Sequence, residues 1–346
     1  MARKTTRALS VTEEDLKNVN EDNIELMEDF LNYLETTDKS PRSIVVYKNN
    51  LEIFFVWLSK YGKNKDFCEI KKRDFMNFQS YLTKLDLSPS RIRNLRSSLS
   101  SLSNFIENIL EDEDEKWKKF RNIVNKIPAP NLVKVREKTV LEDKDCEWLL
   151  ERLVAMKRYQ QACAFALAWA SGRRKSELLR FKVSHIIDEN LIFGSLYKTP
   201  EKISTKGKGK YGKLLNLYIL KSKFKPYFDL WMKQRKELGV PDDIEAIFVV
   251  KKNGEWTPAK ISTMDSWARI FTKFLKQDFY WHSMRHQFTT SLAKLNIPTS
   301  VIKDIIGWES TDMVDLYTDI DVDDKLGQYF GEDGIKKVES KSLSDI

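Results

Sequence analysis

The chain contains 346 residues, with 59 lysines and arginines against 51 aspartates and glutamates, and its formal charge is +8. Three cysteines without a CxxC spacing exclude a disulfide framework and a cysteine-rich zinc site, and 3 histidines disfavour a histidine-rich metal centre. Only 12 glycines argue for a helix-rich protein and against nucleotide-binding folds built on glycine loops. The mildly basic charge allows a polyanionic partner but does not establish one.

The N-terminal segment, residues 1–20, is polar and is expected to be flexible. It lacks the apolar stretch of a signal peptide, and no apolar run approaches the ~18 residues of a membrane-spanning helix. A chain of this length predicts two domains. We therefore expect a two-domain cytoplasmic protein without a membrane partner.

Residues 21–126 show the spacing of apolar side chains that is typical of amphipathic helices. Ser40-Pro41 is a good helix start because proline is preorganised for a first turn, and Gly62 is a stop signal. A shorter helix is expected over 72–85, and a long one follows Ser88-Pro89. Together these segments predict a first domain of four helices.

The last of these helices carries basic residues on the face opposite its apolar stripe. Arg91, Arg93 and Arg96 lie there among several serines, so we expect a solvent-exposed surface rich in arginine and hydroxyl groups.

The boundary between the domains follows an acidic run at 111–115, which we interpret as a solvated charge cluster. Prolines in an irregular stretch mark 127–138 as the interdomain linker. The second domain is then expected over 139–335, followed by a flexible polar tail at 336–346.

The second domain mixes helical and strand patterns. A capped helix start is predicted at 141–145, and residues 162–170 are apolar on almost every side, which is typical of a buried helix. Helical patterns alternate with tight breaks from Ser262 to Tyr317. Short strands are expected over 191–196, 201–205, 214–220 and 247–251.

Four segments of this domain could carry chemistry, and the first directly follows the buried helix. A turn at Gly172 places Arg174 at a helix N-terminus, and Glu177 lies three residues on, where it could hold the arginine or cap the turn. Taken by itself, the segment is more simply interpreted as a capped helix next to a solvated basic turn.

The second segment is the glycine–lysine run at 206–213, between two strand-like stretches. Residues 198–213 contain six lysines and one glutamate, so a hairpin here could lie along a phosphate backbone. The alternative is an exposed loop without a ligand.

The third and fourth segments lie near the end of the domain. His282 and Arg285 share a helix face, and this pair suits a phosphate oxyanion, although a surface basic cluster is the simpler alternative. No carboxylate or further histidine stands at ligand spacing, so no metal is expected. Gly307 predicts a helix end, followed by Trp308 and Tyr317, which taken alone are ordinary core and helix residues.

In this order, the segments resemble the catalytic domain of tyrosine recombinases, the phage-integrase and Xer-like family. That family's pattern is an arginine, a lysine in a β-hairpin, His-x-x-Arg, a histidine or tryptophan, and a tyrosine. The matching residues are Arg174, Lys208, His282, Arg285, Trp308 and Tyr317. The helices after Ser40 and Ser90 also resemble the family's N-terminal core-binding domain.

The resemblance implies a mainly α fold. It combines an N-terminal four-helix SAM-like core-binding domain with a mixed α+β catalytic domain that contains a small antiparallel sheet.

Two assignments keep an alternative. Ser-Gly-Arg precedes Arg174 where Thr-Gly-Leu is commoner, so Arg173 is a competitor, although the Gly-x-Arg-x-x-Glu frame favours Arg174. Counting back from the strand at 214–217 places Lys208 in the family position, with Lys206 as the alternative.

The activity implied by the resemblance is phosphoryl transfer on DNA without a cofactor. Tyr317 would attack the scissile phosphate to give a 3′-phosphotyrosine, and Lys208 would protonate the leaving 5′-oxygen. Arg174 and Arg285 would bind the nonbridging oxygens.

The other site residues would assist this step. His282 would bind an oxygen or help to remove the tyrosine proton, and Trp308 would donate its indole N–H. Glu177 would support Arg174 or His282, and His286 is interpreted as a structural neighbour.

The implied partners are double-stranded DNA recombination sites, bound by a homotetramer that associates with the nucleoid. The C-terminal segment 323–330 would dock on a neighbouring subunit, and accessory DNA-bending proteins are further candidates. The candidate DNA-binding residues are Arg91, Arg93, Arg96, Lys206 and Lys210.

Three other functions are considered: a DNA-binding protein of this fold without catalysis, a type IB topoisomerase or telomere resolvase, and a helical RNA-binding or protein-interaction module. The complete six-residue set argues against the first, and a two-domain chain favours recombination over the second. The third predicts no role for Tyr317.

Overall fold

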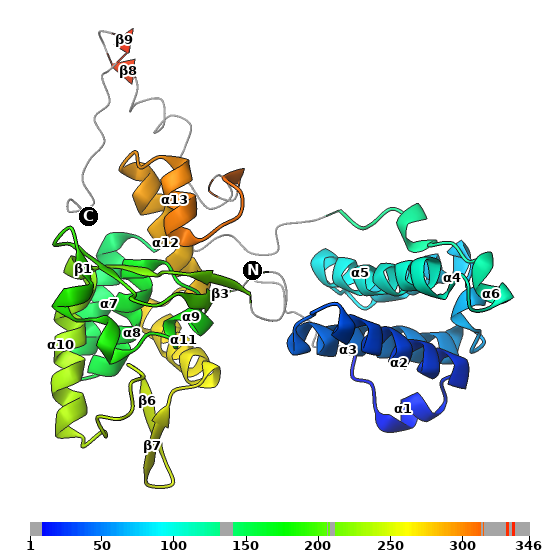
Figure 1. The fold of residues 1–346 in the computed structure, drawn as a ribbon, viewed down its shortest axis with the longest axis horizontal. Coiled ribbons are helices and arrows are strands. Elements are labelled where there is room, and N and C mark those ends of the chain that lie inside the picture. The colour runs from blue at the N-terminus through cyan, green and yellow to red at the C-terminus, as the bar shows by residue number, and fades with distance from the viewer. Residues whose placement is uncertain are drawn as a thin grey trace. The chain divides into compact units, whose positions relative to one another are not determined.

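The chain divides into two compact units, and each is described by itself (Figure 1). Leaving aside Gly207–Gly212, the first is Met1–Glu137 and the second is Lys138–Ile346. The computed structural model describes residues 9–131, 141–205, 207, 212–312 and 314, and the backbone of 330–331 and 334–335.

The first unit is helical throughout its described part. Its α-helices are α1 (Glu13–Lys17), α2 (Glu21–Thr36), α3 (Pro41–Tyr61), α4 (Lys72–Lys84), α5 (Pro89–Phe105) and α6 (Glu115–Lys118). The predicted Ser-Pro starts are confirmed: the Ser40 and Ser88 hydroxyls each accept a backbone N–H from the residue three positions on, at 3.2 Å. Gly62 ends α3, also as predicted.

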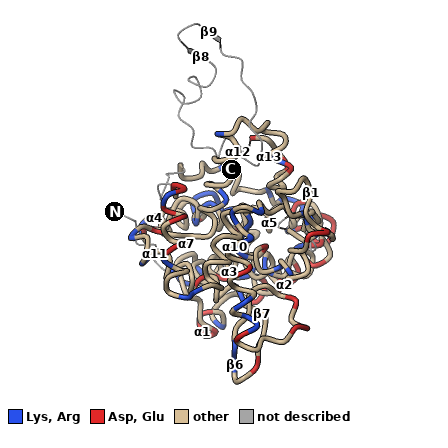
Figure 2. The backbone as a smooth tube through the Cα atoms, turned by 90° about the vertical axis from the view of Figure 1, so that its left-hand side faces the viewer, with Lys and Arg blue, Asp and Glu red and all other residues tan. Residues whose placement is uncertain are grey.

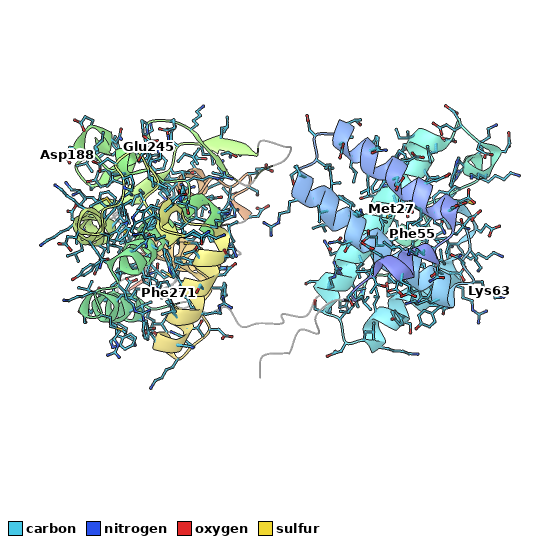
Figure 3. All side chains as sticks on the ribbon, turned by 90° about the horizontal axis from the view of Figure 1, so that it is seen from below. Met27, Phe55, Lys63, Asp188, Glu245 and Phe271 are labelled. Atoms are coloured by element: carbon cyan, nitrogen blue, oxygen red, sulfur yellow. The ribbon has the colours of Figure 1, made fainter. Side chains whose placement is uncertain are left out.

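Phenylalanine side chains form much of the core of this unit. Figure 3 shows Met27 and Phe55 between the helices. The rings of Phe54 and Phe78 meet edge to face, with centroids 4.9 Å apart. This aromatic packing joins α3 to α4, and it is the favourable burial that holds a module of short helices together.

Arg96 corrects the predicted basic face of α5, because its side chain lies inside the unit and is only 7% exposed. It donates to the Val124 carbonyl at 3.0 Å, to the Ile127 carbonyl and to the Gln79 side chain. Its guanidinium also lies 5.2 Å from the Phe75 ring. The segment around residues 124–127 therefore covers a face that was predicted to be open to solvent.

The start of the predicted linker packs on the same unit. Ile127 is buried, and the carbonyls of Pro128 and Pro130 accept hydrogen bonds from Gln79 and Arg93, at 3.3 and 2.8 Å. The rest of the predicted linker, from residue 132 on, lies outside the described residues.

The second unit packs helices around a buried central helix. They are α7 (Asp143–Ala155), α8 (Tyr159–Ser171), α9 (Lys175–Leu178), α10 (Lys221–Glu237), α11 (Ile261–Leu275), α12 (Trp281–Lys294) and α13 (Thr299–Ile306). Residues Ala162 to Ser171 of α8 are all buried, as predicted, and α10 lies alongside α8 (Figure 1). The predicted cap at 141–145 is wrong in detail, because Glu142 occupies the N-cap without a side-chain capping bond.

The strands are shorter and more numerous than predicted. They are β1 (Leu191–Ile192), β2 (Leu196–Lys198), β3 (Ile203–Thr205), β4 (Lys213–Leu215), β5 (Tyr218–Leu220), β6 (Val249–Lys252) and β7 (Glu255–Pro258), with β8 (Phe330–Gly331) and β9 (Gly334–Ile335) near the C-terminus. The antiparallel order β1-β2-β5 forms a small sheet, and β3 pairs with β4.

Two predicted strands are each split in two. Phe193 and Gly194 have φ of 52° and 70°, so the chain turns between β1 and β2. Thr199 holds the break between β4 and β5, because its hydroxyl accepts the Leu217 N–H at 2.9 Å and its carbonyl accepts the Asn216 amide at 2.7 Å. The β3–β4 hairpin is thereby separated from the sheet.

Charged residues of both signs interleave along both units (Figure 2). Among the described residues, no helix is long and apolar enough to cross a membrane.

Candidate active site

The turn between α8 and α9 requires a glycine. Gly172 has φ of 59°, and a Cβ there would lie 2.6 Å from the Cδ1 atom of Phe288 on α12. This close approach seats the turn directly on α12. As a result, Arg173 and Arg174 emerge beside the helix that carries the His-x-x-Arg segment.

Arg174 is fixed by Glu177, as predicted from the spacing. Its guanidinium contacts the Glu177 carboxylate at 2.8 Å, and its backbone N–H donates to the other carboxylate oxygen at 3.2 Å. The Glu177 side chain is 1% exposed, whereas that of Arg174 is 26% exposed. The arginine is therefore held from its buried side and remains partly open to a ligand.

Arg285 lies fully buried in the middle of α12. It donates to the Gly172 carbonyl at 3.3 Å and to the Ile306 carbonyl at 3.2 Å. Its guanidinium lies 5.1 Å from the centroid of the Trp308 ring, within range of a cation–π contact. Arg285 thus joins the α8–α9 turn to the end of α13.

The two histidines of α12 meet edge to face. The half-buried His282 and the buried His286 are one helical turn apart, with ring centroids at 5.3 Å and planes at 87°. His282 shares its helix face with Arg285, as the spacing predicts.

Arg173 is the neighbour that sequence reasoning treated only as a competitor of Arg174. It is 1% exposed, and it donates to the Ile306 carbonyl at 3.3 Å and to the Ile305 carbonyl. Burial lowers its pKa to about 10, so it stays protonated near neutral pH. Its position next to Gly172 was the available signal, but its partners lie far along the sequence.

These arginines surround one carboxylate. Burial raises the pKa of Glu177, but the stronger combined effect of Arg174, Arg173 and Arg285 holds it below its ordinary value of 4.5. Three positive charges therefore face the single negative charge of Glu177. The excess charge, with Arg174 partly exposed, suits an anionic ligand such as a phosphate.

Comparison with known proteins shows the family of this chain. Residues 139–323 match the Phage integrase family, and residues 26–115 match the phage integrase N-terminal SAM-like domain. The chain belongs to the phage integrase family. As a tyrosine recombinase, it is a site-specific DNA recombinase, and its fold class is the one predicted.

Relatives of this integrase-family chain extend over most of its length. It is 31% identical to the SPbeta prophage-derived recombinase-like protein YomM of Bacillus subtilis (strain 168), over 78% of this chain and 76% of that protein. It is 23% identical to the tyrosine recombinase XerA of Pyrococcus horikoshii, over 86% and 90% of the two chains.

Solved structures share the fold of this recombinase. XerH bound to a palindromic difH substrate matches with a TM-score of 0.61 at 19% identity, over 81% of this chain and 77% of that one. A lambda integrase tetramer bound to a Holliday junction also gives 0.61, at 15% identity, over 91% and 82%.

The remaining predicted site residues of the recombinase fall outside the described part. Lys208 and its alternative Lys206, with Lys210, belong to the connection between the paired strands β3 and β4. Tyr317 follows the last described side chain, Val314, by three residues.

The described residues contain no group of three or more His, Cys, Asp or Glu side chains that could hold a metal ion.

Proposed function

We propose that this recombinase cuts and rejoins DNA through a covalent 3′-phosphotyrosine on Tyr317. The observation that supports this proposal most strongly is the cluster of Arg173, Arg174 and Arg285 around Glu177. A buried cluster with excess positive charge would stabilise the additional negative charge of a phosphorane-like transition state.

The reaction conserves atoms and charge in each direction. The phenol oxygen of Tyr317 forms a bond to phosphorus and loses its proton, while the bond from phosphorus to the 5′-oxygen breaks. Lys208 supplies a proton to that leaving oxygen, which becomes a 5′-hydroxyl. Attack by a 5′-hydroxyl from a partner strand reverses the step, so no cofactor is needed.

The described residues support this step in distinct ways. Arg174, partly exposed, would donate to the nonbridging oxygens. Arg285 lies fully buried beside the Gly172 and Ile306 carbonyls and would add its positive charge to the site. His282 would accept or donate a proton at the edge of the site, and Trp308 would supply an N–H and packing.

We propose that a homotetramer of this recombinase acts on two double-stranded recombination sites. The solved structures of XerH bound to difH DNA and of the lambda integrase tetramer bound to a Holliday junction support this by analogy. Candidate DNA contacts are Arg91, Arg93, Lys206 and Lys210. The buried Arg96 is no longer among them.

The decisive test is covalent trapping on nicked duplexes that contain the DNA flanking the protein's own gene. The wild type is expected to give a protein–DNA adduct on a denaturing gel. Tyr317→Phe should give none while still binding DNA, because it lacks the nucleophilic oxygen.

Tyr61→Phe, at an exposed tyrosine of α3, is the matched control and should form the adduct normally. An adduct that persists in Tyr317→Phe would refute the nucleophile assignment.

A further inference from the structure

Arg173 is an unusual residue to find inside a folded unit. It is 1% exposed, and its Nε–H group has no acceptor among the described residues. A buried guanidinium with an unsatisfied donor costs free energy that an apolar side chain of similar length would not. Fold stability alone therefore does not explain why an arginine stands here.

The contacts that Arg173 does make are at the end of α13. Ile305 and Ile306 are the last two residues of that helix, where carbonyls lack helical partners and the helix dipole is negative. Arg173 donates to both carbonyls, and Arg285 donates to that of Ile306 as well. Two guanidiniums thus share one carbonyl oxygen and close the helix from the same side.

Gly307, the residue that follows these two carbonyls, occupies a tightly constrained position. Gly307 has φ of 82°, and a Cβ there would lie 2.3 Å from Leu215 Cδ1 and 3.9 Å from the Arg173 guanidinium. The next residue, Trp308, donates its backbone N–H to the Lys303 carbonyl at 2.9 Å and places its ring against Arg285. Any movement of the α13 end therefore moves Trp308.

We propose that Arg173 is a positioning residue for DNA strand cleavage. Its hydrogen bonds hold the end of α13 in place, so that Trp308 and Arg285 keep their positions relative to Arg174. It also adds a fixed positive charge beside Glu177. This inference rests on the proposed function, because the step it supports is phosphoryl transfer in this site.

Arg235 provides a matched control within the same unit. It is 7% exposed, and its two terminal nitrogens donate to backbone carbonyls, those of Ala246 at 2.6 Å and of Ile244. Its partners precede β6 and include no site residue. Arg235 therefore shares the burial and the pair of carbonyl contacts of Arg173 without its location.

The first measurement compares Arg173→Met, Arg173→Lys and Arg235→Met in the full chain. At saturating DNA, Arg173→Met should lower the single-turnover cleavage rate about 10–100-fold and leave the DNA dissociation constant nearly unchanged. Arg173→Lys should recover part of the rate because it keeps the charge. Arg235→Met should cleave at the wild-type rate wherever it is folded.

The second measurement needs no cleavage. Amide hydrogen exchange at Gly307 and Trp308 should rise in Arg173→Met and stay unchanged in Arg235→Met, because only the first variant releases the end of α13. Unchanged exchange there, or equal loss of cleavage in both methionine variants, would overturn the proposal. Raised exchange together with a wild type that forms no adduct would instead refute the proposed function. The conclusion that Arg173 holds the end of α13 in place would remain valid.

Discussion

Arg96 in the first unit and Arg173 in the second are both buried arginines that donate to two backbone carbonyls, but their surroundings differ in charge. Arg96 completes its hydrogen bonding with the neutral side chain of Gln79 and lies against the Phe75 ring. Arg173 belongs to a group of three arginines around the carboxylate of Glu177.

The difference in charge distinguishes an arginine that supports the backbone, such as Arg96, from arginines that form a ligand site. A single guanidinium can complete the hydrogen bonds of an irregular segment, as Arg96 does for residues 124–127. A group of arginines that outnumbers its carboxylate keeps residual positive charge, which is unfavourable until an anion arrives. The second arrangement is the one expected where phosphate chemistry takes place.

The largest effect is expected from removing the carboxylate of Glu177, which faces the three arginines of the candidate site. Glu177→Gln keeps the size of the side chain but leaves three guanidiniums without a counter-charge, so the free energy of unfolding should fall by about 3 kcal/mol at pH 7. Chemical denaturation of the full chain measures this. Glu189→Gln, at an exposed glutamate of the same unit, should change little.

Acid titration sharpens the same prediction. Because the pKa of Glu177 in the fold lies below 4.5, its stabilising contribution is complete above that pH and is lost as the pH falls below it. The stability difference between the wild type and Glu177→Gln should therefore shrink as the pH decreases from about 4.5. A constant difference would mean that the carboxylate is not the stabilising group.

A smaller effect is expected at Arg96. Arg96→Met leaves the Val124 and Ile127 carbonyls without their donor, and should destabilise the first unit by about 2 kcal/mol. The salt dependence of DNA binding should stay unchanged, because this side chain is enclosed. The salt dependence is compared with that of Arg93→Met, because Arg93 is an exposed residue of the same helix and remains a candidate DNA contact. A reduced salt dependence in Arg96→Met would restore it as a DNA contact.

Sequence reasoning succeeded where the determining residues are close together. The Ser-Pro starts of α3 and α5 are local signals, and Arg174 meets Glu177 only three residues away. It failed where the hydrogen-bond partner is distant in the sequence. Arg96 donates to carbonyls 28 and 31 residues further on, and Arg173 donates to carbonyls 132 and 133 residues away.

The predicted strand over 191–196 failed for a different reason. Phe193 adopts a left-handed backbone conformation that its side chain does not favour, so Gly194 alone signals the turn and the Asn-Gly or Asp-Gly pair typical of such turns is missing.

The smallest predicted effect is a gain of stability, whereas the preceding variants lose stability. Gln79→Glu gives Arg96 a carboxylate in place of an amide, at a half-buried position that already accepts its hydrogen bond. The substitution also removes the amide hydrogen bond from Gln79 to the Pro128 carbonyl. We expect a net gain of about 0.5 kcal/mol in the free energy of unfolding at pH 7, because the charge-assisted hydrogen bond with Arg96 outweighs this loss. The gain should disappear in Arg96→Met/Gln79→Glu, and a double-mutant cycle measures it. A coupling energy near zero in this cycle would show that neutral groups already compensate Arg96 fully. A counter-charge would then matter only where arginines are clustered.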